Sequence, residues 1–183
     1  MNARRLLTAL FIAALASSAL AATRTIRIFE KRQIVIALPE GWKFNFTKDN
    51  QTGVQTMHLE DRGGEVKLEA SFLPDSENDL ATREALEGRL RATSEPMLQA
   101  AVEQEMKVTT TKTSDGLITY STFTDRRFAE GDVPRDERRY ATEGIRSWPG
   151  VSLHFTILTN ELTSDEYRAA LEILTQGLRE VAK

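Results

Sequence analysis

The stretch Ile34–Phe46, IVIALPEGWKFNF, decides the fold because its burial pattern changes at a single turn. Residues 34–38 form an unbroken apolar run, largely β-branched, which is typical of a strand that is covered on both faces. Pro39 and Gly41 end this strand, because proline cannot donate a ladder hydrogen bond and glycine favours turns. Residues 42–47 then alternate aromatic and polar side chains, the pattern of a strand with one buried face. The stretch therefore predicts a core strand, a corner and a second strand.

The N-terminus has the three parts of a secretory signal peptide. Arg4 and Arg5 precede an apolar run over residues 6–16, and small residues at Ala19 and Ala21 suit a cleavage site. This run is too short to span the ~30 Å hydrocarbon core of a membrane. We expect residues 1–21 to be a signal peptide, residues 22–183 to be one globular domain, and the protein to be periplasmic or secreted, without a stable membrane anchor after cleavage. The arginine pair leaves the twin-arginine export route open.

Charge and cysteine content narrow the classes of function. The chain has 24 basic and 27 acidic residues, and loss of residues 1–21 removes two arginines, which leaves 22 against 27 and a net charge of −5. A mildly acidic domain has no electrostatic reason to bind nucleic acid or an anionic membrane. The absence of cysteine excludes disulfides, thiolate metal sites and a lipoprotein anchor. No glycine-rich phosphate loop is present, so we expect no cofactor.

The rest of the chain predicts strands on both sides of one helical region. Turn chemistry at residues 61–64, 114–116 and 148–150 indicates three hairpins. The corresponding strand pairs are residues 54–60 with 66–72, 106–113 with 117–126, and 137–147 with 151–159. An apolar stripe from Leu86 to Ala101 predicts a helix that bends or restarts at Pro96, with Ser94 as a candidate cap.

The C-terminal segment predicts a second helix. Thr163 and Glu166 match a capping box, and an apolar stripe runs from Tyr167 to Val181. Together these elements predict an α+β domain, with a mostly antiparallel sheet of about six to seven strands, a bent mid-chain helix and a C-terminal helix packed on the sheet.

The order of elements and the corner Leu38–Trp42 (LPEGW) resemble the PsbP-like fold, an α/β/α sandwich. That superfamily includes photosystem II extrinsic subunits, a Ran-binding nuclear import factor and exported bacterial DcrB-like proteins. The resemblance covers the architecture of residues 23–183 and about five residues of motif. It implies a non-catalytic accessory or binding module, and it carries over no catalytic residue.

An arginine-rich segment is the sharpest functional signal. Between residues 125 and 146 six arginines alternate with six acidic residues, and guanidinium groups bind carboxylates and other anions through paired hydrogen bonds. The competing interpretation is that these arginines and acidic residues pair with one another on a solvent-exposed surface. Trp148 precedes Pro149–Gly150 at a hairpin tip, where an aromatic ring often stays partly exposed for a partner. The candidate partner-binding residues are Arg126, Arg127, Arg138, Arg139 and Trp148.

Histidine and carboxylate side chains offer an alternative. His58 and Glu60 share one face of a predicted strand with Asp61 beside them, and His154 is the second histidine. If these groups converge, they could bind a metal ion or support hydrolysis. Solvated side chains on a sheet face are the simpler interpretation, and no serine lies in a Gly-x-Ser-x-Gly elbow.

Two classes of function are therefore expected, with a third left open. The first is an exported, non-catalytic binding or assembly module for a protein partner or a small anionic ligand. The second is a metal-dependent or hydrolytic enzyme centred on His58 and His154. A small apolar ligand between helix and sheet is a third possibility, which a cavity would support.

Overall fold

The computed structural model of the protein describes residues 22–29 and 32–181. The predicted signal peptide lies outside the described residues. No helix in the described ranges is long and apolar enough to cross a membrane.

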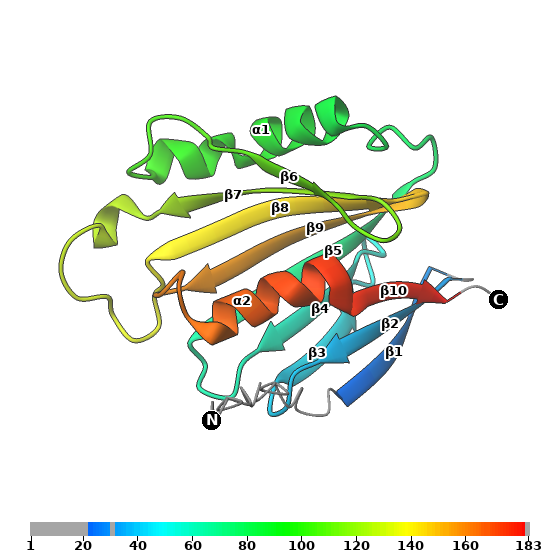
Figure 1. Ribbon diagram of the computed structural model, residues 1–183, viewed down its shortest axis with the longest axis horizontal. Coiled ribbons are helices and arrows are strands. Elements are labelled where there is room, and N and C mark those ends of the chain that lie inside the picture. Colours follow the sequence, from blue (N-terminus) through cyan, green and yellow to red (C-terminus); the bar gives the residue numbers. More distant parts are fainter. Residues whose placement is uncertain (1–21, 30–31, 182–183) are drawn as a thin grey trace, which may run out of the picture.

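A seven-stranded antiparallel sheet forms the centre of the domain (Figure 1). Its spatial order is β3 (Lys43–Lys48), β4 (Gln55–Glu60), β5 (Val66–Asp75), β9 (Gly150–Thr159), β8 (Tyr140–Trp148), β7 (Leu117–Thr124) and β6 (Thr109–Lys112). The pairing of β5 with β9, with Val66 opposite Thr159, joins the strands before the long helix to those after it. The α+β class and the common antiparallel sheet predicted from sequence are confirmed.

A second, three-stranded sheet was not predicted. It has the order β1 (Ala22–Ile28), β2 (Arg32–Leu38) and β10 (Leu178–Val181), with both pairings antiparallel. The Ile34 strand thus belongs to this sheet and not to the large one. On β2 the residues Ile34, Ile36 and Leu38 are buried while Ala37 is exposed, so the strand is covered on one face and the expectation of two covered faces is wrong.

Two helices lie on opposite faces of the large sheet. We call the face toward α2 (Asp165–Glu172) and the small sheet the inner face, and the face toward α1 (Arg83–Ala100) the outer face. The inner face carries the main core, in which side chains such as Phe72 and Leu153 pack against β1, β2 and α2. A second core lies between α1 and the outer face of β7 and β8, around Phe123 and Ile145.

The helices differ from their predictions at three places. α1 is one continuous helix with Pro96 inside it, so two short helices are not formed and the predicted bend is not confirmed. Ser164, and not Thr163, caps α2 by accepting a hydrogen bond from the Tyr167 N–H at 3.1 Å. α2 ends at Glu172, and a π-helical segment, η2 (Ile173–Gly177), connects it to β10.

Candidate functional site

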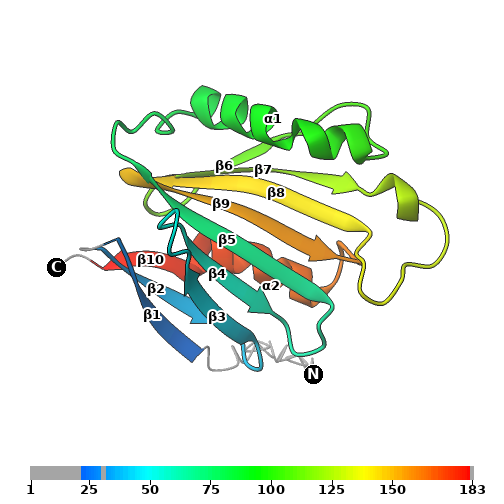
Figure 2. The same ribbon diagram turned by 180° about the vertical axis from the view of Figure 1, so that it is seen from behind.

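The outer face is covered unevenly, and the uncovered half is the candidate site. Figure 2 shows α1 beside β7 and β8, while β3, β4 and β5 carry no helix on this side. The covered half presents apolar side chains such as Phe123 and Ile145, whereas the open half presents Lys43, His58 and Glu69. Alternation on each strand therefore places a polar surface directly above the main core.

Three adjoining hollows on this face form a groove along one flank of α1, which we call the α1 groove. The first, about 610 Å³, lies over β3, β4, β5 and β9. The second, about 230 Å³, lies between α1 and the outer face and shares Glu69 and Thr156 with the first. The third, about 200 Å³, lies at the C-terminal end of α1 and shares Lys67 and Leu158 with the first. The shared residues show that the first hollow adjoins each of the other two.

The second hollow contains a buried hydroxyl that has no partner. Ser94 on α1 is 0% exposed, and its Oγ makes no hydrogen bond. His154 on β9 and Glu143 on β8 line the same hollow. Burying a polar group without a hydrogen bond costs about 1–3 kcal/mol, so Ser94 is a place where a bound polar group would add stability.

Burial lowers the pKa of His154, and the positive charge of Arg89 on α1 lowers it further. The imidazole is therefore neutral near pH 7, with one ring nitrogen free to accept a hydrogen bond. The other charged groups around the second hollow are Glu69 from β5 and Glu143 from β8.

The lowered pKa of His154 predicts a pH-dependent stability. Below the ordinary value of 6.5 the unfolded chain binds a proton that the folded chain does not, so the wild-type protein loses stability as the pH falls from about 6.5 through the folded pKa. In His154→Gln this contribution is absent. Urea unfolding at pH 7.5 and 5.0 should show a smaller acid loss for His154→Gln than for wild type, with His58→Gln as the control. Identical losses in wild type and His154→Gln would contradict the assignment.

The third hollow has an apolar floor and a charged rim. Its floor includes Met97, Phe123 and Leu158, and its rim carries Lys67, Arg127, Arg138 and Arg139 together with Asp125, Asp136 and Glu137. The structure thus places Arg127, Arg138 and Arg139 at one hollow, whereas Arg126 donates to the Ala101 carbonyl at 2.7 Å and lies outside it.

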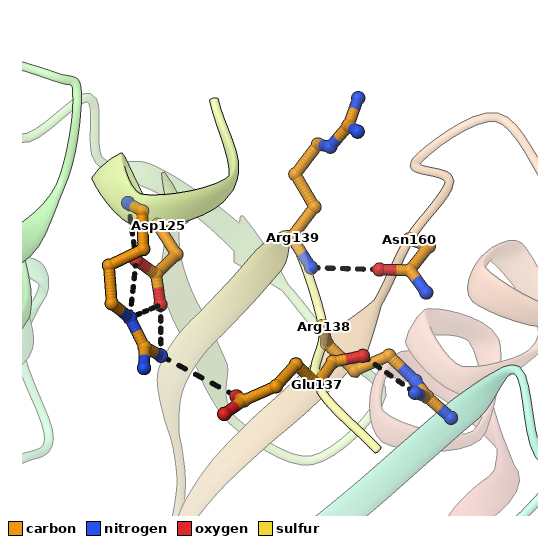
Figure 3. Close-up of polar contacts among 6 residues, drawn as sticks. Asp125, Glu137, Arg138, Arg139 and Asn160 are labelled. Carbon is orange, nitrogen blue, oxygen red and sulfur yellow. Dashed lines mark hydrogen bonds and ion pairs between the residues drawn. The ribbon is translucent and has the colours of Figure 1, made fainter. Parts of the chain in front are cut away.

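The three rim arginines are neutralised to different degrees. Arg127 binds Asp125 through Nη2 at 2.7 Å and Glu137 at 3.5 Å, and its hydrogen bonds lower the pKa of Asp125. The guanidinium of Arg138 instead donates to the carbonyls of residues 64, 135 and 137, and that of Arg139 donates to the Gly131 carbonyl at 2.6 Å. Figure 3 shows the Arg138 and Arg139 side chains pointing away from each other.

Three cations at this end of the groove keep an uncompensated charge. Among the described residues, none of Lys67, Arg138 and Arg139 lies within 4.0 Å of a carboxylate oxygen. The Arg139 Nε is buried and makes no hydrogen bond. One-for-one neutralisation of the arginine segment therefore describes Arg127 but not Arg139.

Trp148 does not belong to this surface, and the expectation that it stays partly exposed is wrong. It is 3% exposed, and its Nε1 donates to Asp115 at 2.7 Å. Trp148 lies nine residue steps from Arg139, at the far end of β8, which corresponds to about 30 Å along a strand. The ring lies under the Arg146 guanidinium, 4.4 Å from its centroid, which makes Trp148 part of the core.

The two histidines of the alternative metal or hydrolytic site do not come together. His58 Nδ1 lies 3.4 Å from a Glu69 carboxylate oxygen. Ser71 on β5 is opposite Thr56 on β4 and opposite His154 on β9. His58, two residues after Thr56, is therefore two strands and two residues away from His154. Standard sheet spacings put their Cα atoms about 12 Å from each other. Two imidazoles at that distance cannot share an ion with bonds of about 2 Å.

The carboxylates of that alternative have structural partners. Glu60 binds Lys43 at 3.0 Å, and Asp61 accepts the N–H groups of Gly63 at 2.7 Å and Val66 at 2.6 Å. Within the described ranges, no group of three or more His, Asp or Glu side chains could hold a metal ion.

The polar residues that matter most here, Ser94 and Glu143, were missed by sequence reasoning. Ser94 was interpreted as a helix cap and Glu143 as one member of the charged segment. The sequence did contain a signal for Glu143. It shares one face of β8 with the apolar residues Ala141 and Ile145, which lie two positions before and after it. Comparisons with protein-family models, curated proteins and solved structures found no match to this chain, so the resemblance to the PsbP-like fold stays a prediction.

Proposed function

We propose that the protein is an exported binding module that holds a ligand with an anionic group in the α1 groove. The proposal of export rests on the residue pattern at positions 1–21. The proposal of binding rests on one observation above all, the uncompensated charges of Lys67 and Arg139 at the rim of an apolar hollow.

The chemistry of the third hollow favours a carboxylate with a short apolar part. Charge-assisted hydrogen bonds from lysine and arginine to an anion are about twice as strong as neutral ones. Met97, Phe123 and Leu158 offer apolar contact next to these donors. Binding pockets commonly combine an apolar lining with a few polar groups that orient the ligand.

The test compares two probes of equal shape and different charge. Hexanoate should shift the amide signals of Phe123, Ala141 and Leu158 in a ¹H–¹⁵N correlation spectrum of residues 22–183, and hexanamide should shift them much less. The double variant Lys67→Gln/Arg139→Gln should weaken hexanoate binding at least tenfold, because losing one charge-assisted contact costs about 1.5–3 kcal/mol.

The matched control is Arg24→Gln/Arg27→Gln, which removes two exposed cations from β1 on the other sheet. Its affinity for hexanoate should equal that of the wild type. Equal binding of hexanoate and hexanamide, or an unchanged affinity in Lys67→Gln/Arg139→Gln, would overturn the proposed function.

A further inference from the structure

Charge is distributed unevenly along the α1 groove. Glu69 and Glu143 both lie opposite Thr156, one on each side of it, and mark the middle of the groove. Glu69 is paired with His58, but within the described residues the Glu143 carboxylate makes neither a hydrogen bond nor an ion pair. The groove therefore has an unpaired anion in one part and unpaired cations at its end.

The surroundings of Glu143 suit an ammonium group. The orphaned Ser94 hydroxyl and the neutral imidazole of His154 line the same hollow, and each has a lone pair that can accept a hydrogen bond. A primary ammonium has three N–H donors. Glu143, Ser94 and His154 provide three hydrogen-bond acceptors, one for each N–H donor. The Glu143 carboxylate also balances the positive charge of the ammonium group.

The spacing of the two charged parts limits the size of the ligand. Lys67 lies two strands and two residue steps from Glu143, and Arg139 lies four residue steps before Glu143, which corresponds to Cα distances of about 12 and about 13 Å. An extended peptide spans about 3.3–3.6 Å per residue. A chain of three to four residues therefore matches the distance between the acceptors and the cations.

We propose that the α1 groove binds short peptides of three to four residues by both free termini. The amino terminus lies against Glu143 and Ser94, and the terminal carboxylate lies against Lys67 and Arg139. This inference rests on the proposed function and adds the recognition of the amino end. Thr156, Leu158 and Met97 between the two ends leave room for small or apolar side chains.

The experiment titrates residues 22–183 with the tripeptide Ala-Leu-Ala and with its N-acetylated and C-amidated forms, by calorimetry. N-acetylation and C-amidation should each weaken binding at least tenfold. Glu143→Gln should weaken binding of the free tripeptide at least tenfold and leave binding of the N-acetylated form unchanged. Lys67→Gln/Arg139→Gln should weaken binding of the free tripeptide and leave binding of the C-amidated form unchanged.

Glu77→Gln, at an exposed acidic residue outside the groove, is the control and should bind all forms as the wild type does. If C-amidation weakens binding but N-acetylation does not, the peptide inference is overturned and the proposed function stands. If neither the tripeptide nor hexanoate binds, both proposals are overturned.

Discussion

Replacing Arg146 by methionine is expected to lower the free energy of unfolding by about 3–5 kcal/mol, the usual cost of breaking a buried ion pair from one side. Arg146 is 0% exposed and lies on the inner face of β8, two residues before its C-terminal end. Its Nη2 lies 2.6 Å from Asp115 Oδ1 and donates at 3.0 Å to the Leu178 carbonyl, and its Nη1 donates to the Leu174 carbonyl. Methionine keeps most of the volume and removes all of these donors.

The position of these carbonyls explains why the loss should be large. Leu174 lies in the π-helical segment η2, and Leu178 begins β10, so Arg146 fixes the segment where the helix becomes a strand. Asp115 lies in the turn between β6 and β7 and also accepts the Trp148 Nε1–H. One side chain thus ties the C-terminal segment and a distant hairpin to β8. Burial lowers the pKa of Arg146 and Asp115 offsets part of this, but a guanidinium keeps its proton in proteins.

Urea unfolding followed by circular dichroism measures this effect. Arg168→Met is the matched control, because Arg168 is exposed and pairs with Asp165 on the surface, where ion pairs contribute little. Asp115→Asn should also destabilise the protein, although less, since its amide oxygen can still accept one of the two hydrogen bonds. An Arg146→Met protein as stable as wild type would show that the buried pair only balances its desolvation cost.

Arg146 also shows where sequence reasoning stops. The composition of residues 125–146 placed it in a charged surface segment with five other arginines. Its neighbours on the same face of β8, Thr142 and Gly144, carry no sign of burial that could have corrected this. The turn signals Asp115–Gly116 and Pro149–Gly150 correctly predicted the hairpins β6–β7 and β8–β9, since those depend on local backbone chemistry. Burial of Arg146 depends on its packing against the distant segment η2, which no residue near Arg146 in the sequence indicates.

The C-terminal segment illustrates the same limit. Leu174, Leu178 and Val181 have helical spacing, yet α2 ends at Glu172. β2 has a free edge that residues 178–181 pair with, and this tertiary pairing outweighs the helical preference. Gly177 is the signal that sequence reasoning left unused, because glycine is frequent at helix ends.

The candidate site was predictable only in part. The segment containing Arg127, Arg138 and Arg139 was found from its composition, and these residues do meet at one hollow. The opposing groups Ser94, Glu143 and His154 come from α1, β8 and β9, and the β5–β9 pairing and the packing of α1 bring them beside that hollow. These are long-range contacts, so alternation could assign each residue a face but could not assign it a neighbour.

Replacing Gly144 by alanine is expected to destabilise the protein by at least about 1–3 kcal/mol, the range for forcing an extra carbon into a packed core. Gly144 lies opposite Phe155 on the inner face. A Cβ at this position would lie 2.2 Å from Phe155 Cζ and 2.6 Å from the Thr119 carbonyl oxygen. The ring must rotate out of the main core, and the β7–β8 pairing must shift, because backbone cannot move aside as a side chain can.

A second glycine provides a control with the opposite sign. Gly88 lies in α1, and a Cβ there would meet nothing within 4 Å. Gly88→Ala should therefore stabilise the protein by about 0.5–1 kcal/mol, the difference between alanine and glycine within a helix. For a domain of this size each kcal/mol moves the thermal midpoint by about 2–4 °C, so the two variants should melt on opposite sides of the wild type. A Gly144→Ala protein that melts at or above the wild type would show that the Phe155 ring does not pack over β8 as the structure has it, and the groove floor on the opposite face of the same strands would then need revision too.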